Sequence, residues 1–198
     1  MRLDIRHLRP TIPSMIGSVL LIAAIAVVLT ATMGAEDENL AKDRNDIKTV
    51  VLRAFDLTHG GTTKLPQPYS TDASSPVPAA VKGMMHKNAL SSLQDVYSAN
   101  SPILADRVEL MQREIDKQGD NGYRDLGGGM RFIRNLTIQV DGDSAVAEAD
   151  IRAWSTFIAE GKKFTPENTA HYRFTLAREA AAWKITDEEF TFLPGQEP

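Results

Sequence analysis

The sequence predicts an α+β protein, in which an N-terminal transmembrane helix precedes three helices packed on a curved four-stranded antiparallel sheet. Three observations predict this class. An uncharged apolar run lies near the start of the chain, apolar residues then recur with helical spacing, and after Gly122 their period changes from about 3.6 residues to about two. Helices followed by consecutive strands are typical of α+β domains, in which the helices cover one face of the sheet.

The apolar run Ile12–Met33 contains 22 residues and no charge. A helix needs about 20 apolar residues to cross the hydrocarbon core of a bilayer. Three arginines precede the run and three acidic residues follow it, so the positive-inside rule leaves the N-terminus in the cytoplasm. We therefore expect a short cytoplasmic head at 1–11, a transmembrane helix at 12–34 and an extracytoplasmic domain at 35–198, in a single-pass protein of the cell membrane.

A cleaved secretion signal is the alternative interpretation of this run. Such a signal has an apolar region of about 7–15 residues, followed by small residues at the cut. Here the run is longer, and the best cut, after Ala35, places Met33 where alanine is preferred. Thr32 and Gly34 offer a weaker cut. Retention of the segment is favoured.

Composition excludes several classes of protein. The chain has no cysteine, which rules out disulfides, thiolate metal sites and a lipoprotein anchor. Its net charge is −4, and because residues 1–35 carry three arginines and one aspartate, the remainder carries −6. Nucleic-acid binding requires a cationic face, so we expect no nucleic-acid partner. The four histidines are scattered without metal-ligand spacing, and we expect no metal and no cofactor.

The three predicted helices follow one another along the chain. The first has apolar residues at helical spacing between Ile47 and Leu57 and ends at Gly60-Gly61. A proline- and glycine-rich loop occupies 60–80, where four prolines preclude a long helix. The second helix covers the apolar stripe from Val81 to Tyr97. The third begins at Ser101-Pro102, a capping residue followed by a proline in the first turn, and ends at Gly119.

The strands are predicted from alternation of apolar and polar residues. Four segments alternate: Met130–Val140, Ser144–Ile158, Ala170–Ala177 and Trp183–Leu193. The first two are joined by a hairpin turn at Asp141-Gly142. On each strand the apolar set must face the helices, because burying unpaired charges costs several kcal/mol. In the last strand this assignment requires a bulge around Asp187.

Strand parity places three polar residues, Tyr172, Ser155 and Arg134, on the inner face, and Tyr172 and Arg134 are the candidates for a ligand pocket. Tyr172 lies among inward aromatic residues, and Arg134 lies among inward apolar residues of the first strand. Arg134 is suited to hold an anionic ligand, but it can also pair with a carboxylate of a helix, or a bulge can turn it outward. The pairing and bulge interpretations are favoured, because an unpaired buried charge is costly.

The same parity places charged residues and one tryptophan on the outer face of the sheet. These candidates for a partner surface are Trp154, Arg152, Asp150, His171 and Arg173. A tryptophan is costly to leave in water and often anchors an interface, although a solvated face with a shielded tryptophan fits the pattern equally well. We assign no catalytic residue.

The order of elements and the closing segment "AAAWKITDEEFTF" resemble the nuclear transport factor 2-like superfamily, a cystatin-like cone of a curved sheet wrapped over helices. The resemblance extends from about Asp37 to Leu193. It implies that enzymes of this superfamily, such as ketosteroid isomerases and polyketide cyclase-like proteins, place an Asp or His base and a Tyr inside the cone. Asp150 and His171 fall on the outer face here, which disfavours catalysis.

The sequence therefore favours a non-catalytic, membrane-anchored module that binds a protein partner or itself. The alternative is an isomerase- or cyclase-like enzyme that uses the cone pocket.

Overall fold

The structure is a computed structural model that describes residues 37–60, 62–70 and 76–196. The chain divides into two compact units, Met1–Lys42 and Asp43–Pro198. In the first unit the described residues, 37–42, are helical. The segment expected to cross the membrane, 12–34, lies outside the described residues. Among the residues that are described, no helix is long and apolar enough to cross a membrane.

The helices of the second unit lie where the sequence predicts them. Residues 43–55 are helical and continue into a π-helical turn, η1, at Asp56–Gly60. Helix α2 covers Ala79–Val96, and helix α3 covers Pro102–Lys117. The predicted cap of α3 is confirmed, because the Ser101 hydroxyl accepts a hydrogen bond from the backbone N–H of Ile103 at 3.2 Å. A short 3-10 turn, η2, follows at Asp120–Gly122.

The sheet has six strands, where four were expected. Their bounds are β1 Arg124–Phe132, β2 Thr137–Asp141, β3 Ser144–Ala159, β4 Lys162–Phe164, β5 Glu167–Glu179 and β6 Ala182–Phe192. All pairings are antiparallel and the main path is β1-β3-β5-β6, with β2 and β4 also paired to β3. The antiparallel α+β class is confirmed, and the strand count is corrected.

The first predicted strand is divided because the chain bends after Phe132. The backbone N–H groups of Ile133 and Arg134 both donate to the carbonyl of Asp150, at 2.7 and 3.4 Å, so the regular ladder stops there. β1 then pairs with the C-terminal half of β3, and β2 pairs with its N-terminal half. The other unexpected strand, β4, lies in the connection between β3 and β5 that was expected to be a loop.

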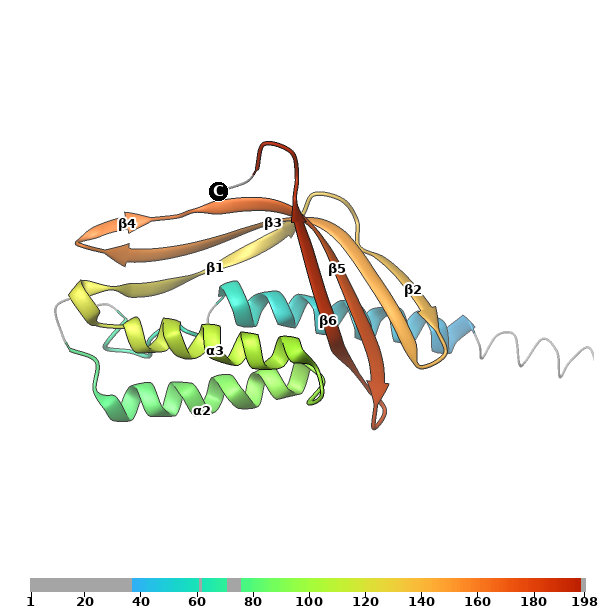
Figure 1. The fold of residues 1–198 in the computed structure, drawn as a ribbon, viewed down its shortest axis with the longest axis horizontal. Coiled ribbons are helices and arrows are strands. Elements are labelled where there is room, and N and C mark those ends of the chain that lie inside the picture. Colours follow the sequence, from blue (N-terminus) through green and yellow to red (C-terminus); the bar gives the residue numbers. More distant parts are fainter. Residues whose placement is uncertain (1–36, 61, 71–75, 197–198) are drawn as a thin grey trace, which may run out of the picture. The chain divides into compact units, whose positions relative to one another are not determined.

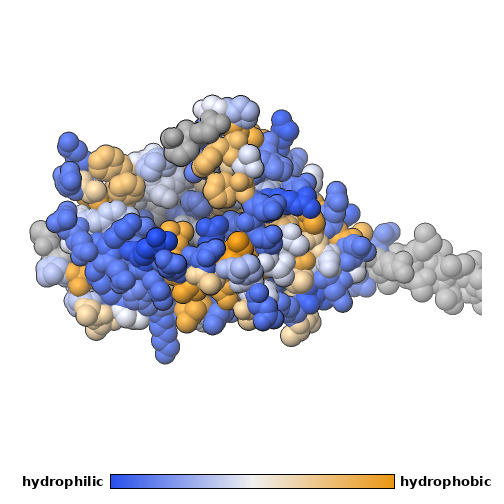
Figure 2. Space-filling model, in the orientation of Figure 1, coloured by the Kyte–Doolittle hydropathy of each residue, from blue (hydrophilic) through white to orange (hydrophobic). Residues whose placement is uncertain are grey.

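The core lies between the helices and the inner face of the sheet (Figure 1). The inward alternation predicted for β3 is confirmed by its buried members Ala145, Ala147, Ala149, Ile151 and Ala153. The small side chains of the four alanines let the helices approach closely. Hydrophilic residues cover much of α2 and α3 on the side that Figure 2 shows. These helices therefore bury one face and leave the other in water.

The first helix is joined to the end of the β5–β6 hairpin by a polar contact. Asp43 accepts hydrogen bonds from Arg178 Nη2 at 2.6 Å and from Trp183 Nε1 at 3.3 Å. The Arg178 guanidinium also lies over the Trp183 ring, 4.6 Å from its centroid. These contacts fix where the helix enters the domain.

Candidate functional site

A buried cluster of polar groups lies inside the cone. The Glu188 carboxylate receives a bond from Arg107 Nη2 at 2.6 Å and another from the Tyr97 hydroxyl at 2.9 Å. Glu188 comes from β6, Arg107 from α3, and Tyr97 from the residue that follows α2. The Glu188 side chain is only 6% exposed. Three elements thus meet at one carboxylate.

A β-bulge turns Glu188 toward this interior. Leu176 pairs with Ile185 and Thr175 pairs with Asp187, which leaves Thr186 as the extra residue. After the bulge Glu188 lies opposite the buried Phe174. The bulge predicted around Asp187 is confirmed, and Glu188 shares the inward side with the two phenylalanines that follow it.

Burial and charge both act on the groups around Glu188. Burial raises the pKa of Tyr97 far above its ordinary value, and the negative charge of Glu188 raises it further. For Arg107, burial is the largest single effect and opposes the charged form, but the charge of Glu188, the interaction with Tyr97 and the hydrogen bonds to both together outweigh it, so the pKa rises. Glu188 is therefore an ion-paired acceptor with both oxygens engaged. Such a carboxylate is poorly placed to act as a free base.

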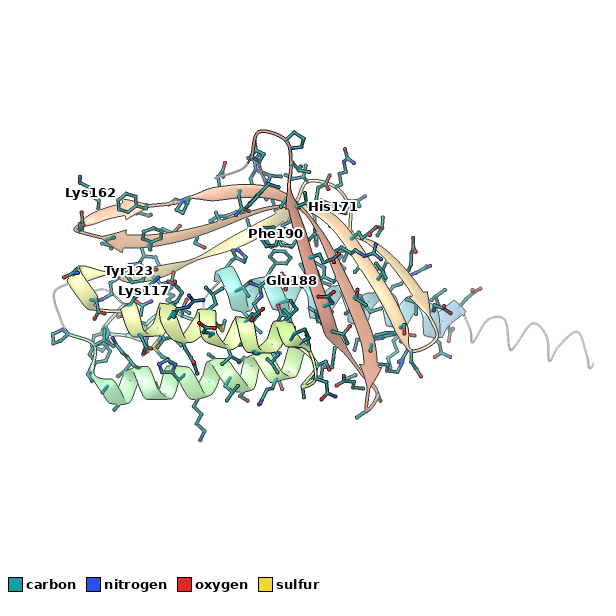
Figure 3. The ribbon with its side chains drawn as sticks, viewed as in Figure 1. Lys117, Tyr123, Lys162, His171, Glu188 and Phe190 are labelled. Atoms are coloured by element: carbon teal, nitrogen blue, oxygen red, sulfur yellow. The ribbon has the colours of Figure 1, made fainter. Side chains whose placement is uncertain are left out.

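Aromatic rings line the interior next to this cluster. Tyr172 packs edge-on against Phe55 at 4.9 Å and stacks on Phe190 at 5.6 Å, measured between ring centroids. Phe190 is 51% exposed although it lies on the same side of β6 as Glu188. Figure 3 labels Glu188 and Phe190 on β6, close to each other above the helices. Burial raises the pKa of Tyr172, and Glu188 adds to this effect.

His59 lies between two hollows of the surface. One, of about 370 Å³, is lined by His59, Trp154, Asn168 and neighbouring residues. The other, of about 230 Å³, is lined by His59, Tyr123, Glu114 and other residues of η1, α3, β1 and β3. Burial, with a smaller contribution from the charge of Arg107, lowers the pKa of His59 to about 4. His59 is therefore neutral at pH 7.

Close backbone packing holds the η1 turn at this position. A Cβ placed on Gly128 would lie 2.0 Å from the carbonyl oxygen of Trp154 and 2.6 Å from that of His59. Only glycine lets β1 approach both backbones so closely. The pairing of β1 with β3 also contains a register shift between Asp125 and Gly127, just before this glycine.

The two residues predicted for a ligand pocket do not come together. Tyr172 is buried on the inner face, as its parity indicated. Arg134 is 82% exposed at its side chain and pairs with Asp150 at 3.1 Å on the outer face. Its inward placement was wrong, because the bend after Phe132 breaks the alternation on which it rested. Two of the alternatives therefore describe this arginine. Its side chain turns outward, and it pairs with a carboxylate, although that carboxylate belongs to the sheet and not to a helix.

The five residues predicted for a partner surface do share the outer face. Arg173 pairs with Glu148, Arg152 lies 3.7 Å from Glu167, and His171 Nδ1 lies 2.9 Å from Asp150 Oδ1. Asp150 is itself buried under Arg134 and His171, although it points outward. Whether these residues bind a partner stays a prediction. Within the described part of the chain, no group of three His, Asp or Glu side chains is arranged to hold a metal ion.

Three residues of the cone were missed by sequence reasoning. Glu188 was detectable, because the parity that turns Phe190 inward after the bulge turns Glu188 inward as well. Arg107 and His59 carried no signal, because a charged residue on an amphipathic helix and a histidine before glycines are usually solvated.

The curved antiparallel sheet with helices on its inner face is similar to the cone of nuclear transport factor 2-like proteins. A family model described as the SnoaL-like domain matches residues 94–188. The family match and the architecture together support a SnoaL-like, nuclear transport factor 2-like fold domain. A search of curated proteins finds no match.

Several solved structures are similar to this chain, and one of them reaches a TM-score of 0.50. The Kfla4162 protein from Kribbella flavida superposes with a TM-score of 0.50 at 13% identity, covering 77% of this chain and 92% of that chain. An NTF2-like protein with a cystatin-like fold from Novosphingobium aromaticivorans gives 0.45 at 20% identity, with 83% and 90% covered. A hexachlorocyclohexane dehydrochlorinase, LinA type 2, gives 0.48 at 12% identity, with 80% and 94% covered. At such identities the likeness concerns the fold alone.

Proposed function

We propose that this protein is a single-pass, membrane-anchored binding module, whose C-terminal domain lies outside the cytoplasm and binds a protein partner without catalysis. The anchor rests on the uncharged run Ile12–Met33 and on the arginines that precede it. The binding surface is the outer face of the sheet around Trp154, Arg152 and Arg173.

The pairing of the candidate acids and bases carries the non-catalytic part of this proposal. A cone enzyme of the isomerase or cyclase type needs a free base inside the cavity. The interior acid, Glu188, instead has one oxygen on Arg107 and the other on Tyr97. Asp150 and His171, the acid–base residues that the resemblance suggests, contact each other on the outer face. Both observations favour binding over proton transfer.

Site-specific photo-crosslinking in intact membranes tests the binding role. A photoreactive residue replaces Thr137 on the outer face in one variant and Lys87 on the solvated side of α2 in a control. We expect a discrete crosslinked protein from position 137 and none from position 87. Crosslinks of equal yield from both positions, or from neither, would contradict a partner on the outer face.

The second candidate is a cone enzyme, and His59 is the observation that favours it. A neutral histidine that borders two hollows is a possible proton acceptor, and Tyr123 and Glu114 line one of the same hollows. Incubation of the full chain with a β,γ-unsaturated ketosteroid tests this function by the absorbance of the conjugated product. Turnover that is lost in His59→Gln would favour the enzyme over the binding module.

A further inference from the structure

Two arginines face each other on the outer face of the sheet. Arg131 on β1 is paired in register with Arg152 on β3. The residues on either side of Arg131, Met130 and Phe132, pack against the core, so the Arg131 side chain points outward. Like charges directly opposite each other on neighbouring strands destabilise a sheet. This pair therefore costs stability in the isolated domain.

The other charges of the outer face are neutralised locally. Glu148 pairs with Arg173, and Asp150 pairs with both His171 and Arg134. A positive charge that is already paired in this way attracts an anionic group of a partner only weakly. The arginine pair differs from these neighbours.

The guanidinium groups of the pair are poorly satisfied. Arg152 has one acidic contact, Glu167 at 3.7 Å, and the Glu167 side chain is 59% exposed. The Nε atom of Arg152 is buried and has no hydrogen-bond partner. Among the described residues, none forms an ion pair or hydrogen bond with the Arg131 side chain. A buried donor without an acceptor is unfavourable, and a carboxylate placed between the two arginines would remove both costs.

An aromatic side chain adjoins the pair on the same face. Trp154 follows Arg152 by two residues on β3 and lies opposite Gly129, and its ring covers the position that a Cβ of Gly129 would occupy. The ring is thereby held flat against β1 and remains partly exposed. A rigid ring beside two arginines offers apolar contact and paired hydrogen bonds in one place.

We propose that Arg131 and Arg152 bind carboxylates of an acidic segment in a partner protein, with Trp154 packing against its apolar atoms. This inference rests on the proposed function and names the chemistry of the partner. Charge complementarity supports it, because Arg131 and Arg152 form a local positive site that the acidic groups of the outer face do not fully neutralise. The bound carboxylates would screen the repulsion within the pair.

Binding of a fluorescein-labelled hexaglutamate peptide tests the inference. The full chain in uncharged detergent is titrated by fluorescence anisotropy at low salt, with hexaglutamine as the neutral probe. We expect hexaglutamate to bind and hexaglutamine not to bind. Arg131→Gln and Arg152→Gln should each weaken the binding of hexaglutamate about tenfold, because each removes charge-assisted hydrogen bonds. Arg113→Gln, on the exposed side of α3, is the matched control and should leave binding unchanged.

A second readout separates a binding role from a structural one. Because the pair repels in the free protein, Arg131→Gln should raise the melting temperature by about 1–2 °C while it weakens peptide binding. A purely structural arginine would lower the melting temperature when replaced.

Three results would overturn the inference. These are unchanged hexaglutamate binding in both arginine variants, binding of anionic lipid vesicles in preference to the peptide, and self-association of the protein that the arginine variants abolish. If any of these results occurs together with crosslinks from position 137, the acidic partner is ruled out and the proposed binding module is not.

Discussion

At the scale of single residues, the direction of each side chain follows from strand parity wherever the ladder is regular. Parity placed Tyr172 inside and Trp154 outside, and the structure agrees. It failed for Arg134, because alternation cannot be extended across a bend that the sequence does not announce. Glu188 is the reverse case. The bulge was predicted, but the inward direction that it gives to this carboxylate was not.

Replacing Glu188 by alanine should destabilise the protein strongly. The variant leaves the Arg107 guanidinium in a mostly buried position without its carboxylate, and it leaves the Tyr97 hydroxyl without its acceptor. We expect a loss of about 3 kcal/mol in the free energy of unfolding. Thermal and urea unfolding of the full chain in uncharged detergent measure it.

Glu148→Ala is the control for this prediction. Glu148 also pairs with an arginine, but the two side chains are 32% and 47% exposed, so its loss should cost less than about 1 kcal/mol. Equal effects of the two substitutions would show that the interior cluster contributes no more than a surface ion pair.

His59 should make stability depend on pH between about 6.5 and 4. Its pKa is lowered to about 4 in the folded protein from 6.5 in the unfolded chain, so between these values the unfolded chain binds more protons. The contribution of His59 to the free energy of unfolding is therefore complete above pH 6.5. It is lost as the pH falls from 6.5 to about 4. It amounts to about 2 kcal/mol, after a discount for the partial exposure of the ring.

The measurement is the melting temperature of wild type and His59→Asn between pH 7 and pH 4. Carboxylates contribute to acid unfolding in both proteins, so the informative quantity is the difference between the two curves. We expect the variant to lose stability less steeply. Parallel curves would contradict a depressed pKa at His59.

At the scale of elements, capping and turn residues fixed the helices and the hairpins, while the length of each strand was harder to predict. Ser101-Pro102 marked the start of α3 correctly. The division into β1 and β2 depends on backbone bonds from Ile133 and Arg134 to Asp150, which join segments distant in sequence. Periodicity reports burial and not such bonds, so the six-stranded sheet was read as four-stranded. The three-residue β4 is too short to show alternation at all.

Gly128→Ala should disrupt the contact between β1, β3 and η1. Its new methyl group would lie within van der Waals overlap of two backbone carbonyl oxygens, which cannot rotate away as side chains do. We expect a loss of about 3 kcal/mol, comparable to overpacking in a core. Thermal unfolding of the full chain measures this loss.

Gly83→Ala on α2 is the matched control. A Cβ at Gly83 meets nothing within 4 Å, so alanine should stabilise the helix by about 0.5–1 kcal/mol. The two glycine-to-alanine changes should therefore have opposite signs. A neutral result at Gly128 would mean that η1 and β1 pack less closely than the structure shows.

At the scale of the whole molecule, the sequence predicted an anchor, a cone and a charged outer face. The cone is supported by the family match and the sheet topology. The anchor rests on residues outside the described part of the chain, and the binding role rests on how charges are paired. The interior could not be predicted in full, because Glu188 lies 91 residues from Tyr97 and 81 residues from Arg107 along the chain.

The most direct test of the anchored binding module is the fate of the full chain in cells. Membranes are extracted at alkaline pH, and intact spheroplasts are treated with added protease. We expect an intact N-terminus, retention of the chain in the membrane pellet after extraction, and removal of the domain beyond Glu36 by protease acting from outside. A soluble protein that begins near Glu36 would contradict the account.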